Sequence, residues 1–419
     1  MFTSYTLKNN ARVILIPQED THSATTLVMY PVGSRYEPEK LAGVSHYIEH
    51  LMFKGTKKRK NTLILTREID RLGAEYNAFT GKEYTGYYIK SDAQYLETSL
   101  DILSDMLFSS LFDPKEMERE KGPVIEEIRM YNDNPLMNIE NVFEDLLYAG
   151  CPLGRDIAGT ETHVKSYRRE DVLAYKEKYY VPRNMTVVIA GNIPGNITTL
   201  IDAYFAKEQS ARRPSAAFRH FQYGPGEKIQ RIRLQKKQTD QTQLMIGFPG
   251  FAHAAKENDT LFVLNAIFGA SMSSRLFIQI RERRGLAYMI RSGSEAFHDT
   301  GYQYIRAGLE SKNINKALSV IAQEIKKMVE RPVTDRELRD AKTHIRGSVT
   351  LSLEDSSAQA NWYARRALFY PMVETPEDVL KKIDRVTKEQ IQALAKRIFR
   401  MHEMRIAIIG DVKKETITF

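Results

Sequence analysis

The hydrophobic pattern of the chain changes between a two-residue period and a helical period. Segments 83–91 (EYTGYYIKS) and 302–310 (YQYIRAGLE) alternate apolar and polar residues, which predicts half-buried antiparallel strands. Apolar residues recur at helical spacing over 92–108 and 313–329. The apolar run at 11–17, ARVILIP, predicts a first strand near the N-terminus. The pattern therefore predicts the α+β class, with antiparallel sheets that carry helices on one side.

The same order of elements occurs twice. An amphipathic helix at 169–180 leads into an apolar strand that ends at Gly191, and 388–399 leads into a similar strand that ends at Gly410. These glycines lie 219 positions apart, and LVMYPVGS and LMIGFPGF repeat earlier in each half at an offset of 217. We interpret the two halves as homologous domains that arose by internal duplication.

The boundary between the halves is predicted from composition. The stretch before residue 229 is polar and is interrupted by Pro214, Gly224, Pro225 and Gly226, which is typical of a linker. We therefore expect an N-terminal domain over 1–210, a linker over 211–228, and a C-terminal domain over 229–419.

Length and composition set limits on the class of protein. The chain has 419 residues, of which 42% are hydrophobic and 27% are charged, as expected for two or three globular domains. Cys151 is the only cysteine, so an intramolecular disulfide is excluded and a reducing compartment is favoured. No apolar run reaches the ~18 residues of a membrane span, and the N-terminal stretch lacks signal-peptide character, so we expect a cytoplasmic protein.

The positive charge does not by itself indicate nucleic-acid binding. The net charge is +8, and the densest basic run, KGTKKRK at 54–60, has no aromatic residues interleaved with it. A solvated loop explains this run better than a nucleic-acid interface does. We therefore expect no nucleic-acid partner.

The pattern with the clearest chemistry is His46-Tyr47-Ile48-Glu49-His50, which reads H-x-x-E-H. Residues three and four apart share one face of a helix, so both imidazoles and the carboxylate point the same way. Two neutral imidazoles can bind one Zn²⁺ while a carboxylate beside them accepts a proton from water. A structural zinc site or buried core histidines are the alternatives, but structural sites usually close with four ligands and often use cysteine.

A reactive zinc site needs a third protein ligand, and a later helix offers one. Glu120 and Glu127 lie seven residues apart and share a helix face, whereas Glu126 points elsewhere. An acidic, solvated helix surface would show the same spacing. The sequence alone leaves both interpretations of these glutamates open.

H-x-x-E-H with a glutamate 77 positions after the second histidine, inside E-x-x-x-V-I-E-E-I, resembles the pitrilysin family of zinc peptidases. That family includes insulin-degrading enzyme and the mitochondrial processing peptidase. The resemblance implies one Zn²⁺ per chain, with His46, His50 and Glu127 as ligands. It implies Glu49 as the general base and Glu120 as a carboxylate that supports a ligand.

The resemblance also implies residues that bind the peptide. Asn77, Ala78 and Phe79 match an edge strand to which the substrate adds as a further strand. The second half has no histidine or glutamate in the region that corresponds to the motif. It has Arg281 and Tyr288 instead, which match a pair that holds the substrate backbone and the developing oxyanion. Without the resemblance, an interior strand and an amphipathic helix would explain these residues.

One segment departs from the family pattern. Relatives often carry a glycine-rich loop before this region, but residues 269–273, GASMS, contain a single glycine. A role of this loop in guiding substrate is therefore not implied for this chain.

These features lead to one predicted function. We expect a zinc endopeptidase that cleaves small peptides or unfolded segments inside a closed chamber. Long family members enclose such a chamber with four domains, so a chain with two is expected to form a homodimer. The alternatives are a catalytic subunit of a heterodimeric processing peptidase and a scaffold subunit of the same fold without peptidase activity.

Overall fold

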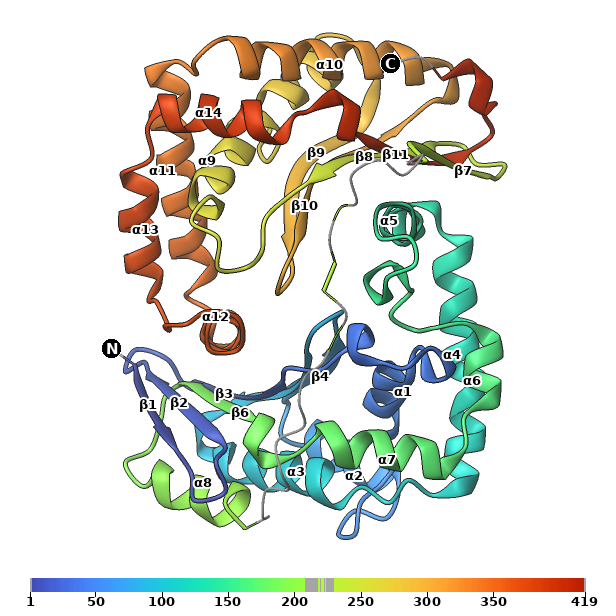
Figure 1. Cartoon of the computed structure of the whole chain (residues 1–419). Helices are drawn as coiled ribbons and strands as arrows, with labels where there is room; N and C mark the ends of the chain where they lie inside the picture. The colour runs from blue at the N-terminus through green and yellow to red at the C-terminus, as the bar shows by residue number, and fades with distance from the viewer. Residues whose placement is uncertain (1, 208–217, 219, 222, 224–229, 418–419) are drawn as a thin grey trace. The chain divides into compact units, whose positions relative to one another are not determined.

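The computed structural model describes residues 2–207, 218, 220, 221, 223 and 230–417. It contains two sheets, β1-β2-β6-β3-β5-β4 and β7-β11-β8-β10-β9, and the second repeats the strand order of the first without a counterpart of β1 (Figure 1). The first sheet consists of β1 (Thr3–Thr6), β2 (Arg12–Pro17), β3 (Ser23–Tyr30), β4 (Glu75–Thr80), β5 (Thr85–Asp92) and β6 (Thr186–Gly191). The second consists of β7 (Ile232–Lys236), β8 (Thr242–Pro249), β9 (Ala287–Ala296), β10 (Gly301–Leu309) and β11 (Arg405–Gly410).

Helices connect the strands in both halves. In the N-terminal half they are α1 (Val44–Leu51), α2 (Thr62–Asp70), α3 (Leu96–Ser109), α4 (Pro114–Asp133), α5 (Pro135–Leu147), α6 (Glu161–Ser166), α7 (Arg169–Tyr179) and α8 (Ile197–Phe205). In the C-terminal half they are α9 (Asn258–Phe268), α10 (Ile314–Glu330), α11 (Asp335–Ser352), α12 (Ser356–Phe369), α13 (Pro376–Asp384) and α14 (Lys388–Ile398). The fold class and the two homologous domains predicted from the sequence are confirmed.

Each sheet contains one pairing that alternation of residues does not reveal. β2 pairs in parallel with β6, and β7 pairs in parallel with β11, while the neighbouring strands pair antiparallel. β6 and β11 are buried along their whole length, so their side chains pack on both faces of the sheet. The sheets are therefore mixed rather than purely antiparallel.

The helices cover both faces of each sheet, because one helix from each half of the sequence packs on the sheet of the other half. The chain forms two compact units, and the first combines residues 1–129 and 155–218 with 352–373. Helix α12 therefore belongs to the first unit, where it packs on β3 and β6 opposite α3 and α8 (Figure 1). Helix α5 makes the corresponding contact with β11 and β8 in the second unit. The prediction of helices on one side thus omits one helix per sheet.

The predicted domain boundaries stay a prediction, because residues 210 and 229 and most of the linker at 211–228 lie outside the described residues. Among the described residues, no helix combines the length and the apolar content that crossing a bilayer requires. Cys151 is buried in the core of the second unit with Phe143 and Tyr148, which agrees with a packing role.

Candidate metal centre

The N-terminus of helix α1 is held by a buried carboxylate. Glu37 accepts hydrogen bonds from the backbone N–H groups of Gly43 and Ser45, at 2.6 and 2.7 Å. Gly43 has a φ of 94°, and a Cβ at this position would lie 2.3 Å from the carbonyl oxygen of Ala158, so only glycine fits. Burial raises the pKa of Glu37 to about 7, although the two backbone hydrogen bonds oppose the rise. Glu37 thus fixes where the motif helix begins.

Helices α1 and α4 bring three potential ligands together. One oxygen of Glu127 lies 3.5 Å from Nε2 of His46 and 3.3 Å from Nε2 of His50. One ligand atom from each of these residues lies within 4.8 Å of the others. Ligand atoms that are ~2.1 Å from a tetrahedral zinc ion lie roughly 3.4 Å from one another. Both the donor set and the spacing therefore fit a zinc ion with three protein ligands.

Hydrogen bonds within the cluster shift the pKa values of His50 and Glu127. Burial opposes a charge on His50, but hydrogen bonds to Glu120 and Glu127 outweigh it and raise its pKa to about 9. Hydrogen bonds from His46 and His50 hold the pKa of Glu127 well below its usual range. Because a metal ligand must be a neutral imidazole, metal binding at neutral pH would release a proton from this cluster.

A second carboxylate orients His50 from its other side. Oε1 of Glu120 lies 3.0 Å from Nδ1 of His50, and Oε2 lies 2.6 Å from Nζ of Lys54. Because Nδ1 carries the proton toward Glu120, Nε2 is left to face the cluster. Lys54 was not singled out in the sequence, because it lies beyond the end of α1 at Leu51, where helical spacing does not predict a shared face.

We expect Glu120→Gln to lower zinc affinity by about 10- to 100-fold, because a neutral amide orients and polarises the His50 ring less well than a carboxylate. The affinity should be measured by competition with a chromophoric chelator. Glu118→Gln on the same helix is the matched control, because Glu118 is mostly exposed and pairs with Lys121. Equal zinc affinity in the two variants would contradict this role for Glu120.

Glu49 lies on the same helix face but takes no part in the three-ligand cluster. Its carboxylate accepts a hydrogen bond from Oγ1 of Thr80 at 2.5 Å. Burial raises the pKa of Glu49, while the hydrogen bond from Thr80 and the nearby imidazoles oppose the rise. A carboxylate with a raised pKa beside a metal cluster is suited to accept a proton from water.

Strand β4 forms an open edge next to this cluster. Among the described strands β4 pairs only with β5, so its outer edge is available to a further strand. Ala78 is buried in the same core as Ile48 of α1, whereas Asn77 is exposed and Phe79 is half-buried on the opposite face. Thr80 connects the end of this strand to the motif helix through its hydrogen bond to Glu49. Because Thr80 lies two residues after Ala78, it shares the face of β4 that packs against α1, which the sequence could have indicated.

Arg281 and Tyr288 lie together in the second unit. Arg281 lies in a π-helical turn, Phe277–Glu282, and Tyr288 lies on β9, where its side chain is 73% exposed. The guanidinium lies 5.0 Å from the centroid of the Tyr288 ring, within cation–π range. Tyr288 is thus neither a core residue nor part of a helix. Its phenol is open to a ligand.

The loop at 269–273 lines a cavity of about 590 Å³ in the second unit, together with Phe277 and Ile290. Met272 in this loop is 74% exposed. The loop contains no cluster of charged or metal-binding groups that would assign it a role. Among the described residues, a group of side chains that could hold a metal ion is formed by His46, His50 and Glu127.

Two family descriptions match successive parts of the chain. The family description "Insulinase (Peptidase family M16)" matches residues 12–161. The description "Peptidase M16 inactive domain" matches residues 166–345. The metal-binding type of cluster falls in the region of the first match.

Similar proteins span almost the whole chain. An uncharacterized zinc protease of Bacillus subtilis is 32% identical over 95% of this chain and 96% of its own length. An uncharacterized zinc protease of Streptomyces coelicolor is 32% identical over 97% of this chain and 89% of its own length. The crystal structure of a protease from Helicobacter pylori has a TM-score of 0.90 at 22% identity, covering 98% of this chain and 99% of that chain. A peptidase M16 inactive domain from Pseudomonas fluorescens has a TM-score of 0.89 at 18% identity, covering 98% of both chains.

Proposed function

The chain belongs to the insulinase family of peptidases, M16, and from this premise we propose that it is a zinc-dependent endopeptidase. The observation that carries the proposal is the spacing of His46, His50 and Glu127, which fits zinc, beside Glu49. Relatives that share about a third of the sequence are named zinc proteases. The test is whether the purified chain binds about one zinc ion and cleaves a quenched fluorescent peptide.

The proposed roles follow from the chemistry of each side chain. When bound, zinc lowers the pKa of a coordinated water toward ~7 and polarises the scissile carbonyl group. Glu49 removes a proton from the attacking water, and its raised pKa makes it a better acceptor. The same carboxyl group then delivers that proton to the leaving amine. Thr80 holds the Glu49 carboxylate in place through its hydroxyl group.

We propose that the substrate binds as an extended strand along the open edge of β4. The backbone of Asn77, Ala78 and Phe79 would pair with the peptide backbone, which is independent of sequence. The hydrogen bond between Thr80 and Glu49 supports this placement, because it connects the end of the strand to the general base. Many peptides could therefore bind at the same edge.

We further propose a homodimer in which Arg281 and Tyr288 of one chain complete the zinc site of the other. The exposed phenol and guanidinium can donate hydrogen bonds to a developing oxyanion. The zinc cluster belongs to the first unit, and Arg281 and Tyr288 belong to the second. In the proposed dimer, the first unit of one chain and the second unit of its partner together form one active site. Two chains would enclose a chamber that admits small peptides and unfolded segments.

Mixing two inactive variants tests this arrangement. We expect Glu49→Gln and Tyr288→Phe each to hydrolyse peptide poorly, since one lacks the base and the other an oxyanion donor. If sites are shared across a two-fold dimer, an exchanged equimolar mixture contains mixed dimers with one intact site each. Activity should then recover to about a quarter of the wild-type level.

The mixture should be assayed before and after subunit exchange, with mass photometry to follow the dimer. The control is a chain that carries both substitutions. Its dimers contain no intact site, so it should stay inactive under the same exchange conditions. No recovery in an exchanged mixture would contradict shared sites. Activity of the wild-type chain only after addition of a second, related subunit would favour the heterodimeric processing enzyme instead. Zinc-free and inactive wild-type chain would favour the scaffold subunit.

A further inference from the structure

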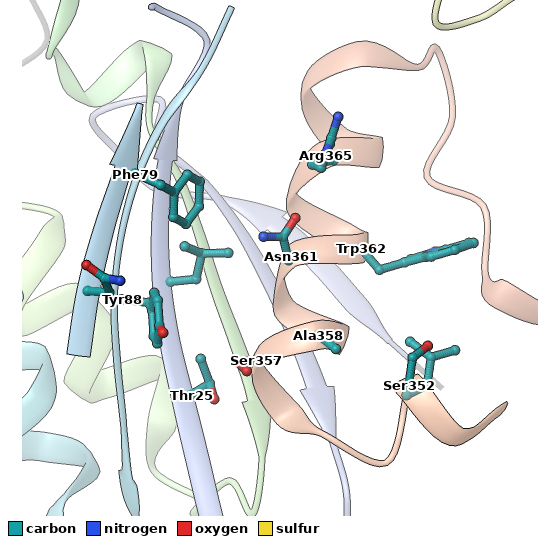
Figure 2. Close-up of a pocket in the computed structure, with 12 residues that line it drawn as sticks. Thr25, Phe79, Tyr88, Ser352, Ser357, Ala358, Asn361, Trp362 and Arg365 are labelled. Carbon is teal, nitrogen blue, oxygen red and sulfur yellow. The ribbon is translucent and has the colours of Figure 1, made fainter. Parts of the chain in front are cut away.

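A groove of about 590 Å³ lies between the first sheet and helix α12 (Figure 2). It lies on the face of the sheet opposite the core that contains Ile48 of α1. Its lining residues all belong to the first compact unit. They come from β3, β4 and β5 on one side and from the region of α12 on the other. The proposed metal site and its ligands do not line it. The groove is therefore a distinct feature of the same unit.

The floor of the groove combines Leu27, Phe79 and Tyr88 with the polar residues Thr25 and Asn77, and it continues to the edge of β4. Asn77 of β4, Tyr88 of β5 and Leu27 of β3 lie side by side in register across the sheet. Phe79 lies two residues after Asn77 on β4 and thus on the same face. Its ring lies close to Gly86 of β5, where an added Cβ would be 2.3 Å from the ring. Figure 2 shows Phe79 and Tyr88 projecting from the strands on the side that faces α12. Gly86 thus leaves room for the Phe79 ring over β5.

The charge on the groove comes from one residue. Arg365 is the only formally charged residue among those that line it. Its guanidinium lies 5.0 Å from the centroid of the Tyr84 ring, near Phe79, and it forms no ion pair with a carboxylate in the described part of the chain. Toward the other end, Lys90 is already neutralised by Asp355. Within the described residues, the groove therefore presents one positive charge that no carboxylate pairs with, beside the rings of Phe79 and Tyr84.

We propose that this groove is a specificity site for acidic peptides, in which Arg365 pairs with an acidic side chain of a peptide bound along β4. The proposal rests on the proposed function, because that function places the peptide on the edge of β4. Side chains of an added strand alternate between the two faces of the sheet. Every second side chain of the peptide would then project on the face of Asn77 and Phe79, over the groove.

The chemistry of the groove favours one pattern of peptide side chains. An aspartate or glutamate near Arg365 gains a charge-assisted hydrogen bond, and the aromatic ring beneath it lowers the local polarity. The next side chain of the peptide on this face would lie beside Asn77 of β4, the strand that the peptide joins. A lysine or arginine in place of the acid would face Arg365 and be repelled.

Peptide binding to a chain that does not hydrolyse the peptide tests the inference. Two fluorescein-labelled peptides that differ only in a central Glu or Lys are titrated against zinc-loaded Glu49→Gln chain, and anisotropy gives the Kd. We expect the Glu peptide to bind about fivefold more tightly, as a solvent-accessible ion pair allows. Adding Arg365→Gln should bring the ratio close to one, and Arg365→Glu should reverse it.

Arg366→Gln is the matched control, because it removes the same charge from the next position of α12. Arg366 packs on the rings of Trp362 and Tyr370 and does not line the groove. This control should keep the preference for Glu, which separates the groove from the general attraction of a chain with net charge +8. An equal loss of the preference in both variants would overturn the proposal.

Cleavage mapping provides a second, independent readout. In alanine-rich peptides with one Glu moved along the chain, the wild-type enzyme should cut at a fixed spacing from that Glu, as mass spectrometry would reveal. In Arg365→Gln the cut sites should no longer follow the Glu. Cleavage that ignores the Glu in wild type overturns the groove proposal alone. Absence of both zinc and cleavage overturns the proposed function.

Discussion

Glu49→Gln is expected to reduce peptide hydrolysis by about 10³-fold or more while the zinc content stays at the wild-type level. The substitution preserves the shape of the side chain and the acceptor for the Thr80 hydroxyl. It removes the group that accepts a proton from water, and general-base catalysis contributes about 10²- to 10⁴-fold. The zinc content should not change, because Glu49 is outside the cluster formed by His46, His50 and Glu127.

The measurement combines metal analysis with initial rates on a quenched fluorescent peptide. Thermal unfolding of both proteins with zinc bound controls for the fold. Thr80→Val is a graded companion variant, because it removes the hydrogen bond to Glu49 and leaves the carboxylate in place. It should lower kcat less than Glu49→Gln does. Full hydrolysis by Glu49→Gln would show that another group is the base.

The second large effect is expected from Glu127→Gln. Its oxygen approaches both imidazoles, and the carboxylate supplies the only negative charge among the three ligands. Replacing the Glu127 carboxylate by a neutral amide should weaken zinc binding by more than the roughly 10- to 100-fold expected for Glu120→Gln, since Glu120 contacts a ligand and not the metal. Hydrolysis should be lost at zinc concentrations that saturate the wild-type chain.

The neighbouring Glu126→Gln is a closely matched control. It makes the same change one position away, on a side chain that is exposed and pairs with Arg129. Its zinc affinity and its rate should equal those of the wild-type chain. Excess zinc is expected to restore part of the activity of Glu127→Gln, since the two histidines remain. If Glu126→Gln lost zinc and Glu127→Gln kept it, the assignment of the third ligand would be wrong.

Much of the architecture could be predicted from periodicity along the chain. The helix expected at 169–180 is α7, the one expected at 388–399 is α14, and the strands that end at Gly191 and Gly410 are β6 and β11. These elements depend on the spacing of apolar residues within one segment, so a local pattern describes them. The parallel pairing of β2 with β6 could not be predicted in this way, because it joins strands from distant parts of the chain.

Part of the candidate site could be predicted for the same reason. His46, Glu49 and His50 share a face because the helical repeat places residues three and four apart together. Glu127 was placed with them by resemblance, and the folded chain brings its oxygen to 3.3 Å from His50. Glu37 had no local signal, because its partners are backbone N–H groups that become available only where α1 begins.

The sequence by itself determined the identity and local order of the chemical groups: the H-x-x-E-H motif, its absence from the second half, and the repeated α+β elements. Such features depend on residues that are close along the chain, where helix and strand periods apply. The tertiary structure decided which distant residues meet. It packed α12 on the first sheet, left the edge of β4 open, and placed Arg365 beside Phe79 without a carboxylate partner among the described residues. These contacts depend on packing between segments hundreds of residues apart, which no local pattern records.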